Sequence, residues 1–168
     1  MVTMVTNTGH HNTTEVDKLY FTTQTGSSPS ADLLPLSPDL LLGKVVCLLY
    51  GAAWSPPFLD FLSVFRQFYT ELKSNQAPVQ VVYVSFDRSR EETRELVRGF
   101  PESWVSVPHS SSLVNYLKLK FSVVVIPRLV VVTDSGQLIT DKGVREVRRR
   151  AKRCFVDWYN AAKCSETS

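Results

Sequence analysis

Long apolar runs are absent from this chain, and their absence excludes a membrane-spanning helix. The longest candidates, residues 45–50 and 123–132, have the length of strands, and Pro127 interrupts the second. A spanning helix needs about 20 predominantly apolar residues. Residues 1–30 also lack the apolar core of a secretory signal, and no arginine precedes Arg66, which argues against a mitochondrial transit peptide. We therefore expect a soluble, cytoplasmic protein.

Cysteine is scarce, which excludes a disulfide framework and a structural zinc site as first interpretations. Only Cys47, Cys154 and Cys164 occur, without a CxxC motif or a cysteine–histidine cluster of zinc spacing. His10 and His11 could suggest a metal site, but no third ligand lies nearby, and we interpret them as ordinary polar residues. The expectation is a protein without metal or other cofactor.

The composition is that of a globular protein. The chain has 168 residues, of which 43% are hydrophobic and 21% charged. At this length one core can bury about two thirds of the surface of the unfolded chain. We expect a flexible N-terminal arm over residues 1–15, a single domain over 16–163 and a C-terminal tail over 164–168.

Acidic residues are nearly missing from one basic segment. Between Lys142 and Arg153 only Glu146 opposes seven basic residues, while the rest of the chain is mildly acidic. This distribution does not indicate a nucleic-acid binder, whose positive charge is spread over a docking face. The segment could be a patch for nuclear import or an acidic partner, a membrane-docking surface, or the solvated face of a helix, which we favour. Its candidate residues are Arg145, Arg148, Arg149, Arg150, Lys152 and Arg153.

Three apolar runs rich in β-branched residues predict strands that are covered on both faces, at residues 45–50, 79–86 and 129–133. Between the first two, residues 58–73 have apolar side chains at helical spacing and predict an amphipathic helix. Strand, helix and strand in this order form a right-handed βαβ unit.

The remaining elements follow from shorter signals. Ser89 and Glu92 have the spacing of a capping box and predict a helix that ends near Arg98. Residues 112–121 predict a third helix, and a strand at 137–140 completes a hairpin. A short strand at 19–23 and a closing helix over 144–163 complete the pattern. The order predicts an α/β, thioredoxin-like sandwich, in which helices flank a central mixed sheet and a helix closes the chain.

Two segments carry a more specific resemblance. Residues 52–58 read Ala-Ala-Trp-Ser-Pro-Pro-Phe between a predicted buried strand and a helix, and Ile126-Pro127 precedes the hairpin strand. In thioredoxin-type enzymes the first segment reads Trp-Cys-x-x-Cys, and the second carries a cis-proline that faces it. The resemblance therefore implies that Pro127 is cis.

The wider chain resembles the tryparedoxin and nucleoredoxin branch of this superfamily. The ending, residues 154–162, resembles the C-terminal helix of the nucleoredoxin-like proteins, the rod-derived cone viability factor group of sensory neurons. The other matching segments are residues 42–46, 82–87, 104–108, 121–123 and 136–143.

The motif departs from this family at the two positions that carry its chemistry. Ser55 occupies the position of the nucleophile and Phe58 that of the resolving cysteine. Disulfide exchange needs a thiolate, which a serine hydroxyl cannot replace. Cys47 lies within a predicted buried strand, where a cysteine is usually inert. We therefore expect no enzymatic activity, and interpret Trp54, Ser55, Pro56, Pro57 and Phe58 as a vestigial motif.

Ser55 itself has two interpretations. Serine is a favoured N-cap, and the prolines that follow fit the first helical turn, so a capping role is our prediction. The alternative is a serine nucleophile, which needs a base. His109 is the only histidine outside the arm, in a loop that the fold need not bring to Ser55.

The surface that binds substrate in thioredoxin-type enzymes could remain a docking site for a protein partner in this chain. Its candidate residues are Trp54, Phe58, Ile126, Pro127 and Arg128. This region grips extended peptides beside the proline in related proteins, as the resemblance implies. The other interpretation of Arg128 is an exposed arginine at a strand end.

Three functional classes follow. The first is a redox-inactive binding protein, for which the resemblance implies a role in the survival of photoreceptors or other sensory neurons, in the cytoplasm with the nucleus also open. The second is a thiol oxidoreductase that uses a cysteine outside the motif. The third is a structural subunit of a larger assembly.

Overall fold

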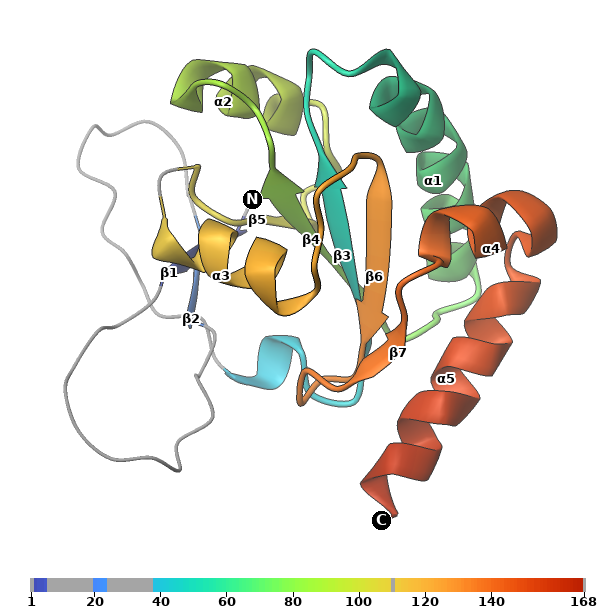
Figure 1. Ribbon diagram of the computed structural model, residues 1–168. Helices are drawn as coiled ribbons and strands as arrows, with labels where there is room; N and C mark the ends of the chain where they lie inside the picture. Colours follow the sequence, from blue (N-terminus) through green and yellow to red (C-terminus); the bar gives the residue numbers. More distant parts are fainter. Residues whose placement is uncertain (1, 6–19, 24–37, 110, 168) are drawn as a thin grey trace, which may run out of the picture.

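A seven-stranded mixed sheet organises the chain in the computed structural model, which describes residues 2–5, 20–23, 38–109 and 111–167 (Figure 1). The strand order is β2-β1-β5-β4-β3-β6-β7. The strands are β1 (Val2–Val5), β2 (Tyr20–Thr23), β3 (Val45–Gly51), β4 (Val79–Ser85), β5 (Val105–Ser106), β6 (Arg128–Val132) and β7 (Leu138–Thr140).

The helices are η1 (Pro38–Leu40), α1 (Pro56–Ser74), α2 (Arg90–Arg98), α3 (Ser112–Lys120), α4 (Gly143–Arg150) and α5 (Arg153–Glu166). β3 pairs in parallel with β4, and α1 connects the two strands, which confirms the predicted βαβ unit. β6 runs antiparallel to β3 and β7 antiparallel to β6, so the sheet is mixed. The α/β sandwich predicted from the sequence is confirmed.

Each central strand contributes to two cores, because alternate side chains point to opposite faces of a sheet. Cys47 and Leu49 of β3 pack with the buried face of α1 and with α5. Leu48 and Tyr50 pack on the other face, with α3. Both faces of β3 and β4 are therefore buried, as their continuous apolar runs predict.

The closing helix differs from the prediction, because residues 144–163 form parts of two helices instead of one. The chain turns at Ala151, where φ is +45°, and α5 then continues through Cys164 to Glu166, into the segment predicted as a tail. α4 contacts α1 and β6, whereas α5 contacts β3 and β7. Val147 of α4 and Cys154 of α5 face the same core on the two sides of this turn.

Two strands were not predicted. β5 has only two residues, too few for a periodic pattern, although both are buried beside β4. Residues 2–5 of the expected arm form β1, which pairs with β5 and β2. The other residues of that arm, including His10 and His11, lie outside the described residues.

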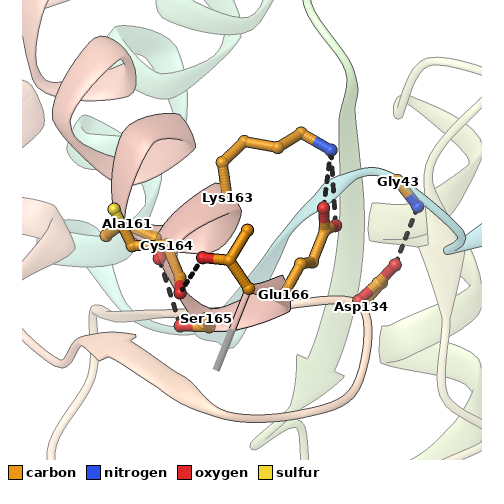
Figure 2. Close-up of polar contacts among 8 residues, drawn as sticks. Gly43, Asp134, Ala161, Lys163, Cys164, Ser165 and Glu166 are labelled. Carbon is orange, nitrogen blue, oxygen red and sulfur yellow. Dashed lines mark hydrogen bonds and ion pairs between the residues drawn. The ribbon is translucent and has the colours of Figure 1, made fainter.

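The end of α5 lies beside the turn between β6 and β7, at the lower end of the molecule in Figure 1. Asp134 of this turn accepts a hydrogen bond from the Gly43 backbone N–H at 2.8 Å, and Lys163 of α5 forms an ion pair with Glu166 (Figure 2). Gly43 has a φ of +72°, which favours glycine. The loop between β3 and α1 lies at the opposite, upper end of the sheet.

Candidate functional site

Ser55 is the N-cap of α1, as the sequence predicts. Its backbone is extended, with φ −101° and ψ 103°, and its Oγ accepts a hydrogen bond from the Phe58 backbone N–H at 3.4 Å. Pro56 and Pro57 are exposed in the first helical turn, where the missing N–H of proline has no intrahelical partner to lose. Ser55 is itself buried, so its hydroxyl is committed to ending the loop and starting the helix.

Phe58 does not lie on the docking face, and its assignment to that surface is wrong. Its side chain is 0% exposed and packs against Tyr83, with ring centroids 6.0 Å apart. The ring also fills the space next to Gly51, where an added Cβ would lie 2.0 Å from Phe58 Cε2. The apolar stripe of α1 faces the sheet, and Phe58 is its first member. The aromatic surface predicted around Trp54 and Phe58 therefore has only Trp54.

Trp54 is exposed beside the end of β4. Its indole Nε1–H donates to the Phe86 carbonyl oxygen at 3.2 Å, and the Arg88 guanidinium lies 5.2 Å from the centroid of its ring. The side chain is 45% exposed, whereas Trp104 and Trp158 are 0% and 2% exposed. Trp54 is thus the one tryptophan that a partner could contact.

The second half of the docking face precedes β6. The Ile126–Pro127 peptide bond is cis, as the resemblance implies, and both residues are partly buried. Tyr50 pairs with Arg128 in the ladder between β3 and β6. This register brings the chain that leaves β3 and the chain that enters β6 to the same edge of the sheet (Figure 1).

Val124 and Val125 are two further exposed apolar residues next to the cis-proline, although the sequence did not single them out. They are 81% and 64% exposed, between the end of α3 and the cis-proline. The strand expected from the sequence begins only at residue 129, after Pro127 interrupts the apolar run that contains these two valines. Their exposure was not predicted, although the break at Pro127 already separated them from that strand.

The side chain of Arg128 is held by Asp141. Its Nη1 donates to the Asp141 carbonyl oxygen at 3.3 Å and lies 3.9 Å from Asp141 Oδ2. The side chain is only partly exposed. Arg128 therefore borders the face as half of an ion pair.

A buried carboxylate holds the loop that presents Trp54. Asp87 Oδ1 accepts from the Ala53 backbone N–H at 2.6 Å. Its Oδ2 accepts hydrogen bonds from three hydroxyl groups, those of Tyr83, Ser85 and Thr93. Asp87 does not stand out in the sequence, since an aspartate after a strand is common in turns.

Tyr83 is one of the residues that contact the Asp87 carboxylate. Its hydroxyl lies 2.9 Å from the Gly51 carbonyl oxygen and 3.1 Å from Asp87 Oδ2, and these two acceptors share its one proton. Burial, and then the negative charge of Asp87, raise the pKa of Tyr83 far above its ordinary value. The tyrosine therefore stays a neutral donor that links β4 to the end of β3.

Two of the three cysteines are poorly placed for thiol chemistry. Cys47 is fully buried in β3, and burial, with a contribution from Cys154, raises the pKa of its thiol strongly. Burial and the nearby Glu146 raise the pKa of Cys154 to about 12. Both environments oppose the thiolate that exchange requires. Cys164 is exposed on the last turn of α5 (Figure 2), whose end lies at the lower end of the molecule in Figure 1, opposite the loop between β3 and α1.

His109 is engaged away from Ser55. Its Nε2 lies 2.7 Å from the Asp87 carbonyl oxygen, and the tautomer protonated at Nε2 donates to that oxygen. Ser55 Oγ instead accepts from the Phe58 backbone. The two groups of the serine-nucleophile alternative therefore have different partners.

The basic segment lies on the exposed side of α4 and at the start of α5. Arg150 forms an ion pair with Asp157, and the Arg148 guanidinium lies 5.7 Å from the centroid of the Phe61 ring. Glu146 points elsewhere, since it accepts from Thr140 and from the Trp158 indole. Arg145, Arg149, Lys152 and Arg153 form no ion pair with another described residue.

The described part of the chain contains no cluster of three or more histidine, cysteine, aspartate or glutamate residues that could hold a metal ion. No helix in this part is both long enough and apolar enough to cross a membrane.

Comparisons with known proteins agree with the fold. Residues 43–138 match a family model described as thioredoxin-like. Nucleoredoxin-like protein 1 of Mus musculus is 30% identical over 76% of this chain, which spans 61% of that protein. The tryparedoxin of Trypanosoma brucei has 26% identity and a TM-score of 0.67, over 76% of this chain and 88% of that one. The thioredoxin of Wuchereria bancrofti has 34% identity and a TM-score of 0.61, over 74% and 85% of the two chains.

Proposed function

This chain belongs to the thioredoxin-like family, as a nucleoredoxin-like protein, and we propose that it acts by binding a protein partner without thiol–disulfide exchange. The observation that carries the proposal is the structural role of the residues at the two positions where thioredoxin-type enzymes have cysteine. Ser55 is a buried N-cap and Phe58 a fully buried core residue. Neither side chain can provide the thiolate of an exchange reaction.

The backbone before β6 supports a binding role. Among the described residues, the peptide groups from Val124 to Pro127 form no backbone hydrogen bond, and pairing with β3 begins only at Arg128. An extended segment of a partner can pair with such groups by adding a strand. Val124, Val125 and Trp54 would then provide exposed apolar contacts on either side of that segment.

A biological setting follows from the family resemblance. The likeness to the rod-derived cone viability factor group supports a role in the maintenance of photoreceptors or other sensory neurons. We place the protein in the cytoplasm, and the exposed arginines of α4 are compatible with entry into the nucleus.

The test is disulfide reduction by the purified protein, with insulin and a glutathione mixed disulfide as substrates. We expect the natural protein to reduce neither substrate. Ser55→Cys should attack the glutathione mixed disulfide, because it places a thiol at a helix N-terminus, where the pKa of a cysteine falls. Reduction of either substrate by the natural protein at an enzyme-like rate would overturn the proposal.

The double variant Ser55→Cys/Phe58→Cys is a weaker comparison. Phe58 is fully buried, and removal of most of its ring costs about 3–5 kcal/mol of stability. The single variant avoids this cost, and its thermal unfolding should be measured beside that of the natural protein. If Ser55→Cys reduces neither substrate although it unfolds like the natural protein, the surface around position 55 no longer accepts disulfide substrates.

A further inference from the structure

Two positively charged side chains lie over aromatic rings at the vestigial motif and next to it. The Arg88 guanidinium lies 5.2 Å from the centroid of the Trp54 ring, and the Lys118 ammonium lies 3.8 Å from the centroid of the Phe86 ring. The hydrogen bond from Trp54 Nε1 to the Phe86 carbonyl oxygen joins the two aromatic residues. We call Trp54, Phe86, Arg88 and Lys118 the cation–aromatic face.

Three elements assemble this face at one edge of the sheet. Trp54 follows β3, Phe86 and Arg88 follow β4, and Lys118 comes from the second half of α3. β3 and β4 are parallel neighbours, so their carboxyl ends meet at the same edge, which is the upper one in Figure 1. The backbone of residues 124–127 enters β6 at this same edge of the sheet.

Among the described residues, no carboxylate pairs with either cation. Within the described residues, Arg88 and Lys118 form no ion pair. Asp87 directs its carboxylate inward to Ala53, Tyr83, Ser85 and Thr93. Glu92 accepts a hydrogen bond from the Arg88 backbone N–H, which places it at the start of α2 as a capping residue.

Of the two cations, Lys118 is partly buried, which is less usual for a charged side chain. Burial lowers the pKa of its ammonium group, and no acidic neighbour offsets that effect. A cation that has lost part of its water and has no counterion gains most from an anion brought by a ligand.

We propose that the cation–aromatic face selects an acidic partner segment, whose carboxylates contact Arg88 and Lys118 while an adjacent apolar side chain covers the Trp54 ring. This inference rests on the proposed function, because it names the chemistry of the segment that would pair with residues 124–127. The exposed apolar area of Trp54, Val124 and Val125 beside only two cations favours a peptide with mixed acidic and apolar residues over a polyphosphate chain.

The experiment compares two short blocked peptides that differ only in charge. One has two glutamates between valines, and its twin has glutamines at the same positions. Tryptophan fluorescence of the full chain reports binding, since Trp54 is its one exposed tryptophan. Two charge pairs, one at the exposed Arg88 and one at the partly buried Lys118, correspond to a preference for the glutamate peptide of about tenfold at low salt, which should shrink as salt is added.

Matched variants locate the preference. Arg88→Gln/Lys118→Gln should bind both peptides equally. Lys73→Gln/Arg149→Gln removes the same charge from the last turn of α1 and from α4, and should retain the preference. If this control loses the preference to the same extent, overall charge or the arginines of α4 are responsible, and the inference is overturned.

The remaining outcomes separate the inference from the proposed function. Equal binding of both peptides by the natural protein would overturn the acidic preference and leave a peptide-binding protein. Binding of neither peptide, or tighter binding of a single-stranded oligonucleotide than of the glutamate peptide, would also overturn the inference. The reduction assay, which involves neither Arg88 nor Lys118, decides the proposed function separately.

Discussion

The Asp87 carboxylate accepts a hydrogen bond from the Ala53 backbone N–H at 2.6 Å, across 34 positions of the sequence. This contact joins the loop after β4 to the loop after β3. Ala53 immediately precedes Trp54, so the position of the exposed indole depends on a carboxylate from another part of the chain. Asp87 thereby positions the loop that carries Trp54, although it does not itself reach the surface.

Removal of this carboxylate should loosen the loop. We expect Asp87→Ala to lower the free energy of unfolding by about 3 kcal/mol, because it leaves buried donors without an acceptor. Asp87→Asn should lose less, since its amide oxygen can still accept from Ala53. Urea unfolding measures both losses, and the Trp54 emission maximum of the folded variants reports the loop.

The control for this series is Asp60→Ala on the exposed side of α1, which should change stability by less than about 0.5 kcal/mol. Equal losses in Asp87→Ala and Asp60→Ala would contradict the positioning role.

The capping role of Ser55 can be measured directly. We expect Ser55→Ala to lower the free energy of unfolding by about 1 kcal/mol, because the Phe58 backbone N–H loses its acceptor. Ser63→Ala, on the exposed side of the same helix, should cost less. Chemical denaturation of both variants decides the point, and a smaller loss for Ser55→Ala than for Ser63→Ala would refute the cap.

Gly51 should tolerate no side chain. A Cβ at this position would lie 2.0 Å from the Phe58 ring. We expect Gly51→Ala to destabilise the protein by about 2 kcal/mol or more through overpacking. The matched control is Gly99→Ala, where the nearest atom, at 3.3 Å, is the flexible end of Arg66. Similar melting temperatures for the two variants would show that the core around Phe58 is looser than the structure indicates.

Cys154 should make stability depend on pH in the alkaline range. Its pKa of about 12 in the folded protein lies above the ordinary thiol value of about 8.5. The folded state thus favours the protonated thiol, so its contribution is complete below about pH 8.5 and is lost as the pH rises towards 12. The unfolding free energy of the natural protein should therefore fall more steeply above pH 9 than that of Cys154→Ala. Parallel curves would contradict this assignment.

Local patterns predicted most of the fold because the information lies within a few residues. Continuous apolar runs identified β3 and β4, helical spacing identified α1, and the Ser89–Glu92 spacing identified the start of α2. The same locality explains the failures. β5 is too short to show a pattern, and the turn at Ala151 depends on which surfaces α4 and α5 must each cover.

The site was predicted in part. Trp54, Ser55 and the cis-proline followed from the motif and the resemblance, and the cap at Ser55 is confirmed. Phe58 was placed on the wrong side, because an aromatic residue at a helix start can face either solvent or core. The exposure of Val124 and Val125 depends on where pairing with β3 begins, which the apolar run does not reveal.

The sequence by itself determined the class of fold and the absence of cysteine at Ser55 and Phe58, since both are properties of consecutive residues. The tertiary structure alone decided that Asp87 supports the loop of Trp54 and that Arg88 and Lys118 lie over aromatic rings. These contacts join residues from different elements, and strand register and helix packing set their distances. Charge and hydrogen bonding act through space, so the contacts from which we propose an acidic partner segment became visible only when the chain was folded.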